Sequence, residues 1–373
     1  MNKYIFFLYI LFVCTFVYAQ NLVTVTPERP YWYVLEEGKR NFRQGAYGDA
    51  LLDFEDARNI RNAMYSQMEQ DMITLLSLRE VRQYKDNLDM IEKYVYEHGQ
   101  LRARDALNEL YYRVEKESLG NSVQKALACF SKLKNYPEAD YWIGEIYRVE
   151  GELAISEKQY RKALENRSQL ESSGFAVSIE YRLASLLKER RNFNEMEKVY
   201  GQLLQSDTLW QESQGFVRQA MNRTLKTEGL NRFLVMYRYK NSDTEAAHRE
   251  LGFYYLSNGR HGNALEHLMF AVLIQNSTII EELIRRQYDY AFADMEQLQE
   301  ALRRRKELKA YMDDVDYYHT LYALAAALYA NGNEKPARGI WSFLAAAEDA
   351  GEWRGRSAAQ LRGPRLEGRI ENR

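Results

Sequence analysis

The strongest constraint in this sequence is a set of small residues that recur at fixed intervals inside helix-forming stretches. In residues 251–271, LGFYYLSNGRHGNALEHLMFA, Gly252 is followed seven residues later by Gly259 and twelve residues later by Ala264. Glycine is unfavourable in a helix interior. Its presence there indicates that another element packs very close to the backbone.

The same spacing recurs in four other segments, and in all five a small residue occupies the eighth position. These residues are Gly38, Gly144, Ala184, Gly252 and Ala325. The segments are residues 31–64, 137–170, 177–210, 245–278 and 318–351. Each is predicted to be a helix, a tight turn and a second helix. The small residue is expected to face the second helix, and a glycine seven residues later is expected to end the first helix in a left-handed conformation.

This pattern resembles the tetratricopeptide repeat (TPR), a helical hairpin of 34 residues. The resemblance covers about residues 31–351 and implies an all-α fold, a right-handed α-solenoid of stacked TPR helical hairpins. The repeat starts at 177 and 245 differ by 68 residues, which is two periods and predicts a degenerate copy at 211–244. Residues 65–136 and 279–317 are expected to be degenerate or longer hairpins. An ordinary α-helical bundle with Ala-rich contacts is the alternative.

Composition agrees with a folded helical chain and gives no charge signal for a polyanionic partner. Hydrophobic residues make up 46% and charged residues 28% of the 373 residues, with only five prolines. The net charge of −2 does not favour binding to nucleic acid or to a membrane surface. The basic run near Arg303 is followed by several aspartates, so we interpret it as a solvated helix face rather than an anion-binding patch.

The first nineteen residues have the pattern of a secretory signal peptide. Lys3 precedes an apolar run that is followed by VYAQ, and cleavage is expected after Ala19. The expected location is therefore exported and periplasmic, with an uncleaved anchor as the alternative. Val13 before Cys14 disfavours a lipoprotein signal. Removal of the signal would leave Cys129, for which a buried apolar role is expected.

The remaining ends of the chain are expected to lie outside the repeats. Residues 20–30, with two prolines, are predicted to form a short extended lead. Residues 352–373, rich in Arg and interspersed with Gly and Pro, are predicted to be a flexible basic tail.

No arrangement of residues in the sequence predicts catalysis. The five histidines lack the spacing of a zinc protease, and neither a phosphate-binding glycine loop nor a Gly-x-Ser-x-Gly elbow occurs. We therefore predict no catalytic residue, no cofactor and no metal site. An enzyme with its site in 65–136 or 279–317 is the least favoured alternative.

The resemblance instead implies a binding surface on the concave face of the solenoid, which the first helices of TPR hairpins line. The second, fifth, ninth and twelfth positions of each repeat point into that groove in the family. The aromatic residues at these positions are the expected partner-binding residues: Trp32, Phe42, Tyr141, Tyr181, Phe253, Tyr322 and Tyr329. The alternative is that a Tyr-rich chain places Tyr everywhere. One TPR subgroup binds a C-terminal carboxylate with Lys and Asn, but here Leu35 and Lys39 occupy the corresponding positions, which disfavours that mode.

The function that follows is a non-catalytic, exported scaffold or adaptor that binds an envelope protein or peptide through its concave face. Tyr suits such a groove because it combines a large rigid contact area with a polar tip. No nucleic acid or metal is expected as a partner, and membrane association is expected only through partners. The alternative is an accessory ligand-binding subunit of an envelope transport or outer-membrane assembly system.

The signal-peptide interpretation predicts that the mature exported chain begins at Gln20. N-terminal sequencing of exported protein checks this directly. An intact Met1, or a lipid on Cys14, would contradict the expected location.

Overall fold

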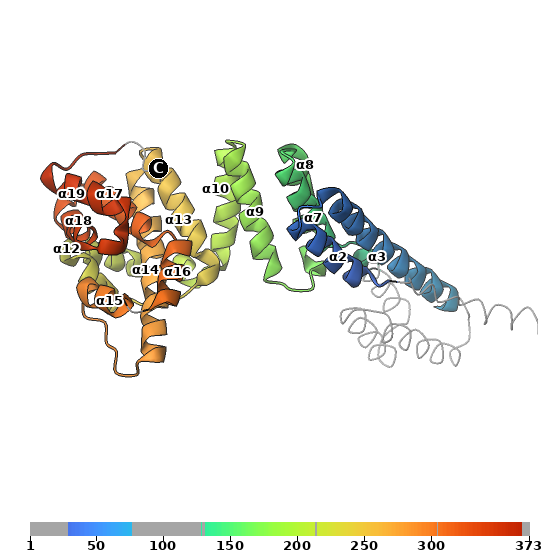
Figure 1. Cartoon of the computed structure of the whole chain (residues 1–373), viewed down its shortest axis with the longest axis horizontal. Coiled ribbons are helices and arrows are strands. Elements are labelled where there is room, and N and C mark those ends of the chain that lie inside the picture. The colour runs from blue at the N-terminus through green and yellow to red at the C-terminus, as the bar shows by residue number, and fades with distance from the viewer. Residues whose placement is uncertain (1–28, 77–127, 129–130, 213–214, 304, 368–373) are drawn as a thin grey trace, which may run out of the picture. The chain divides into compact units, whose positions relative to one another are not determined.

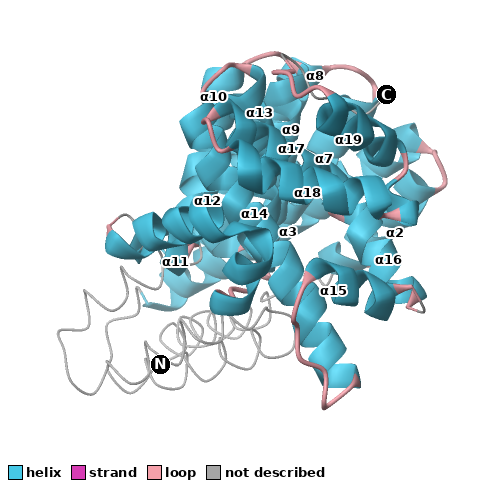
Figure 2. Ribbon diagram, turned by 90° about the vertical axis from the view of Figure 1, so that its left-hand side faces the viewer, coloured by secondary structure: helices cyan, strands magenta, loops and turns pink. Residues whose placement is uncertain are grey.

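The computed structural model describes residues 29–76, 128, 131–212, 215–303 and 305–367. All secondary structure in these ranges is helical, so the prediction of an all-α protein is confirmed there (Figure 2). The chain divides into two compact units, Met1–Arg190 and Arg191–Arg373. The division falls inside the predicted repeat 177–210. Among the helices described, none has the length and apolar character required to cross a membrane.

The first unit contains helical hairpins packed on one another (Figure 1). Helix α2 packs on α3, α7 on α8, and α8 on α9. The bounds are α2 Tyr31–Arg43, α3 Tyr47–Leu76, α7 Pro137–Val149, α8 Leu153–Glu165 and α9 Phe175–Glu189, with a short 3-10 turn at Arg167–Gln169. Helix α3 continues twelve residues beyond the expected repeat end at 64. The predicted signal peptide and both cysteines lie outside the described residues.

The second unit is built around the long helix α14, whose central part is buried and against which α13 and α17 pack. The bounds are α10 Phe193–Leu203, α11 Thr208–Glu212, α12 Phe216–Met236, α13 Ser242–Ser257, α14 His261–Arg286, α15 Met295–Leu302, α16 Lys306–Asp314, α17 Tyr317–Ala330, α18 Glu334–Ala346 and α19 Glu352–Arg362, with 3-10 turns at Leu204–Ser206 and Glu348–Ala350. Helix α12 is interrupted at Gly229, whose φ of 84° is not helical.

The first helix of each aligned segment is followed by a residue with left-handed backbone. After α13, the Gly259 amide donates to the Leu256 carbonyl at 3.2 Å and the Arg260 amide donates to the Tyr255 carbonyl at 2.9 Å. This is the Schellman arrangement, and it satisfies two terminal carbonyls of the helix. The residues in this position are Gly45 (φ 80°), Gly151 (83°), Arg191 (56°), Gly259 (70°) and Gly332 (76°).

The glycines at the eighth position lie directly against a large side chain of the second helix, sixteen residues later. A Cβ on Gly252 would be 2.6 Å from Leu268 Cγ. A Cβ on either of the other two glycines would lie 2.6 Å or 2.7 Å from the nearest atom of an aromatic ring. These pairs are Gly38 with Phe54, and Gly144 with Tyr160. These large side chains pack on the glycine of their own hairpin, and Phe54 also stacks on Trp142 of the next hairpin. Ala184 and Ala325 are fully buried.

The C-terminal segment differs from the expected flexible tail. Residues 352–362 form helix α19, which packs on α18, and residues 363–367 follow it without regular secondary structure. The buried Trp353 explains the helix, because its ring stacks on His319 with a centroid distance of 4.4 Å. The many arginines of this segment favoured the prediction of a flexible tail, and the burial of Trp353 was not predicted.

Gly252→Leu is predicted to destabilise the protein, because the new side chain would overlap Leu268. Overpacking of a close contact costs about 1–3 kcal/mol of unfolding free energy or more. Gly262→Leu is the matched control, since a Cβ at this exposed position of α14 meets nothing within 4 Å. Urea unfolding of both variants checks the prediction, which fails if they are equally stable.

Candidate functional site

The predicted partner-binding residues do not share one environment. Trp32 is 53% exposed, and Phe42, Tyr181, Phe253 and Tyr329 are half-buried. Tyr141 and Tyr322, in contrast, are 6% and 0% exposed. The expectation that these two tyrosines are solvent-facing anchors is therefore wrong.

Ring packing explains why the fifth position of these first helices is buried. The Tyr141 ring lies 4.9 Å from the ring of Phe175 and 5.7 Å from that of Tyr160, so it fills the space between α8 and α9. The Tyr322 ring lies 5.1 Å from that of Trp353 on α19. Truncation of either would open a core cavity rather than remove an exposed contact.

A cleft of about 620 Å³ lies in the first unit, on the helices that the repeat pattern assigned to the concave face. It is lined by α2, by α7 with the residue before it, and by residues 171–178. Five lining residues occupy predicted inward positions of three different segments: Trp32, Leu35, Lys39, Glu138 and Ser178. The others are Glu36, Tyr136, Trp142, Glu171, Ser172, Gly174 and Phe175.

Trp142 is the fixed aromatic element of the cleft. Its ring stacks on Phe54 with centroids 5.8 Å apart and meets the edges of Phe42 and Tyr141 at 5.4 Å and 5.3 Å. The Lys39 ammonium lies 5.9 Å from the centre of the same ring. Trp142 was not among the predicted binding residues, because its place in the repeat does not point inward. Its Nε1 is buried and has no hydrogen-bond partner in the structure.

Carboxylates outnumber cations in the cleft. The lining contains three carboxylates, Glu36, Glu138 and Glu171, and one ammonium, that of Lys39, which donates to Glu36 at 2.6 Å. Glu138, in the first turn of α7, is only 7% exposed and its Oε1 accepts the Glu171 amide at 2.6 Å. Burial raises the pKa of the Glu138 carboxyl, and its Oε2 has no hydrogen-bond partner.

A buried arginine lies next to the cleft residue Tyr136. The Arg61 guanidinium is fully buried, 4.5 Å from the centre of the Tyr136 ring, and its Nε donates to the Leu133 carbonyl at 2.9 Å. The positive charge of Arg61 opposes the effect of burial on the pKa of Glu138. The Tyr136 hydroxyl, like Glu138 Oε2, is buried without a partner. The lining of the cleft thus offers donors, an acceptor and aromatic surface, a combination suited to a peptide.

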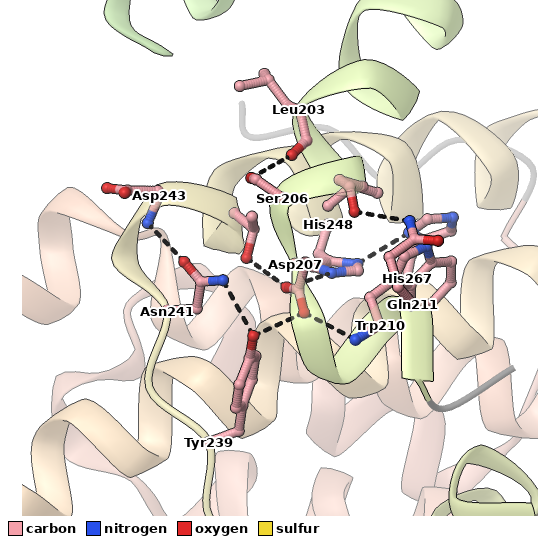
Figure 3. Close-up of polar contacts among 12 residues, drawn as sticks. Leu203, Ser206, Asp207, Trp210, Gln211, Tyr239, Asn241, Asp243, His248 and His267 are labelled. Carbon is pink, nitrogen blue, oxygen red and sulfur yellow. Dashed lines mark hydrogen bonds and ion pairs between the residues drawn. The ribbon is translucent and has the colours of Figure 1, made fainter. Parts of the chain in front are cut away.

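A second polar cluster, in the second unit, is centred on the fully buried Asp207 (Figure 3). One oxygen accepts the Tyr239 hydroxyl at 2.7 Å and the Trp210 amide at 2.8 Å, and the other accepts the Thr244 hydroxyl at 2.6 Å. His248 Nε2 lies 3.5 Å from the latter oxygen. Burial alone would raise the pKa of Asp207, but these hydrogen bonds outweigh burial and hold it at about 2.

His248 and His267 form a buried pair in this cluster, with their Nδ1 atoms 3.0 Å apart. One ring must donate and the other accept, so a single proton lies between the two nitrogens. Trp210 stacks on His267, and the Arg218 guanidinium lies 3.7 Å from the centre of the Trp210 ring. The sequence alone did not predict this pair, because His248 and His267 lie on the two different helices of one hairpin and match no local motif.

The cluster joins elements of the second unit through hydrogen bonds. Asp207 immediately precedes α11 and caps it by accepting the Trp210 amide. The hydroxyls of Thr244 on α13 and of Tyr239 in the segment before α13 donate to the same carboxylate, which connects α11 to these elements. A nucleophilic relay would need a reacting group on the second imidazole nitrogen of His248, but that nitrogen faces His267. Across the residues that the structure covers, no group of three or more His, Cys, Asp or Glu could hold a metal ion.

Comparison with known proteins identifies relatives without a described function. No model of a protein family matches the chain. It is 25% identical to an uncharacterized protein of Treponema pallidum (strain Nichols) over 336 residues, which cover 88% of this chain and 89% of that one. It is 21% identical to an uncharacterized protein of Borreliella burgdorferi (strain ATCC 35210 / DSM 4680 / CIP 102532 / B31), with coverage of 61% and 77%. Among solved structures, BtubC (BKLC) from P. vanneervenii matches 85% of this chain and 97% of that one at 13% identity, with a TM-score of only 0.30.

The histidine pair predicts a loss of stability in mild acid. Burial lowers the pKa of both imidazoles, and neighbouring positive charges lower that of His267 further. As pH falls through about 6.5, the unfolded chain binds protons that the folded chain does not, and each neutral histidine costs up to about 1.4 kcal/mol per further pH unit. Asp207 stays ionised in this window, because its pKa is about 2.

Urea unfolding at pH 7.5 and 5.5 should show a smaller pH dependence for His267→Phe than for the wild type. Phenylalanine preserves a ring against Trp210 and removes one titrating group. His261→Gln, at a half-buried position outside the pair, is the control. An unchanged pH dependence in His267→Phe would show that the pair does not control acid stability.

Proposed function

We propose that this protein is an exported, TPR-like helical-repeat adaptor that holds an extended segment of an envelope protein in the cleft of the first unit. The observation that carries the proposal is that the cleft is lined by residues from predicted inward positions of three segments. A repeat pattern read from the sequence and a cleft found in the structure thus point to the same surface.

The lining favours a partner segment that combines apolar and basic side chains. Trp32 and Trp142 offer aromatic surface, and the carboxylates of the lining exceed its ammonium groups. A Lys or Arg of the partner would be attracted by both features. The unpartnered Trp142 Nε1 and Tyr136 hydroxyl could donate to main-chain carbonyls of the segment after a small adjustment of the lining.

A binding role also fits the absence of reactive geometry in the cleft. Its lining contains no His, Cys or Thr, and its two serines have no imidazole beside them in the lining. Acyl transfer by a serine requires an adjacent base. Aromatic anchors around a polar floor are instead typical of interface hot spots.

Trp32→Ala is predicted to weaken partner binding without unfolding the protein. The Trp32 side chain is 53% exposed, so its removal opens little of the core, whereas loss of an interface anchor costs about 2–4 kcal/mol of binding free energy. A photoreactive phenylalanine derivative at position 32 should cross-link a partner in cells. Affinity of the purified partner for Trp32→Ala should then fall at least about tenfold.

Tyr288, on the second unit and 98% exposed, is the matched control for both measurements. A cross-linker at position 288 should not give the same adduct, and Tyr288→Ala should bind normally. Identical adducts from both positions, or unchanged affinity of Trp32→Ala, would show that the cleft is not the binding site.

A further inference from the structure

The chain after α19 folds back across α17 and α19 and is held through its backbone. The Gln360 side chain accepts the Arg365 backbone amide at 2.9 Å through Oε1 and donates to the Arg365 carbonyl at 3.2 Å through Nε2. The Tyr329 hydroxyl donates to the Pro364 carbonyl at 3.3 Å. An amide that pairs with both backbone groups of one residue reads an extended main chain, independent of its side chain.

The same segment places one carboxylate among three donors. Glu367 Oε1 accepts the Tyr322 hydroxyl at 2.8 Å and Gln360 Nε2 at 3.1 Å, while Oε2 accepts Arg356 Nη2 at 2.7 Å. The Glu367 side chain is only 15% exposed. Hydrogen bonds from an arginine to a shielded carboxylate are among the stronger polar contacts in proteins.

The donors are positioned by the protein core and not by the segment they hold. The Arg356 guanidinium lies 4.6 Å from the centre of the Trp353 ring and 5.0 Å from that of Tyr322. Trp353 in turn stacks almost parallel on His319, with 4° between the planes. Burial, with the nearby Glu367, raises the pKa of Tyr322 to about 12, so its hydroxyl remains a donor at neutral pH. A fixed set of donors of this kind is preorganised for a carboxylate.

The segment itself provides little else that would fix it in place. Leu366 is 62% exposed and Arg365 is exposed, while Pro364 is half-buried, so no fully buried apolar side chain anchors this stretch. Its attachment consists of the polar contacts around Gln360, Tyr329 and Glu367, all of which another extended chain with a glutamate could make. Two of the site's residues, Tyr322 and Tyr329, are positions predicted from the sequence to bind a partner.

We propose that Arg356, Tyr322, Gln360 and Tyr329 form a recognition site for an extended segment of a partner protein that presents one glutamate, bound through its main chain and its carboxylate. The chain's own residues 364–367 occupy this site and compete with that segment. This site is independent of the cleft in the first unit and takes the opposite charge. A swapped tail from a second copy is less favoured, because Arg365 lies only five residues from Gln360 and closes on it locally.

The experiment uses the full chain and a fluorescent peptide with the sequence of residues 363–369, GPRLEGR, blocked at both ends. Glu367→Ala should bind this peptide at least about tenfold more tightly than the wild type, because the internal competitor has lost its carboxylate. A peptide with Gln in place of its Glu should bind about tenfold more weakly to Glu367→Ala than the parent peptide, since the charged pair is lost.

Tyr322→Phe in the Glu367→Ala background separates recognition from folding. It removes one hydroxyl and retains the buried ring, so peptide affinity should fall while the melting temperature and helical circular dichroism remain close to those of Glu367→Ala. Trp32→Ala should leave peptide binding unchanged, so that failure here and failure of the cleft proposal are distinguishable.

Four results would overturn the proposal. Equal affinity of the wild type and Glu367→Ala would show that the tail does not compete, and equal affinity for the Glu and Gln peptides would show that no carboxylate is read. Absence of peptide binding to a folded Glu367→Ala would show that the site serves the tail alone. A wild-type dimer in light scattering that Glu367→Ala lacks would instead assign the site to a second copy of the chain.

Discussion

The close contact between a small residue on the first helix and a large side chain on the second sets the geometry of these hairpins. At Gly252 the missing side chain leaves room for Leu268, and Gly144 does the same for Tyr160. The large residue can also contact the neighbouring hairpin, since Phe54 on α3 packs against Gly38 and stacks on Trp142 of α7 with centroids 5.8 Å apart. Contact between hairpins also uses other positions, and Tyr141, packed between α8 and α9, is one of them.

Some features of the fold depend on local backbone chemistry and others on contacts between distant helices, and only the first kind could be predicted from the sequence. Left-handed residues after the first helices follow from local backbone chemistry, so the glycines at these turns could be predicted, and Arg191 adopts the same conformation without a glycine. The burial of Tyr322 could not be predicted, because it depends on Trp353, which lies 31 residues away on a helix whose composition suggested a flexible tail. The His248–His267 contact likewise exists only once two helices have paired. Position within a repeat identified the lining of the cleft better than residue type did.

The cleft and the carboxylate site differ in how their polar groups are satisfied. Buried polar atoms without partners are uncommon in folded proteins, since each loses its hydrogen bonds to water. In the cleft, Trp142 Nε1, the Tyr136 hydroxyl and Glu138 Oε2 are such atoms. At the carboxylate site, Arg356 and Gln360 are paired with the chain itself. A ligand in the cleft would complete hydrogen bonds, whereas a ligand at the carboxylate site must replace them.

This difference has a consequence for how each site would respond to a partner. Binding in the cleft gains free energy from contacts that the free protein lacks, so its affinity is set by the fit of the partner segment. Binding at the carboxylate site exchanges one set of charge-assisted hydrogen bonds for another, so its net affinity depends on how strongly Glu367 holds the tail in place. The two proposed sites would also select opposite charges, because the lining of the cleft contains more carboxylates than ammonium groups and the second site offers an arginine. In a partner with one basic segment and one segment that presents a glutamate, the basic segment would bind only in the cleft and the glutamate only at the carboxylate site. This pairing would give specificity even if neither segment bound tightly alone.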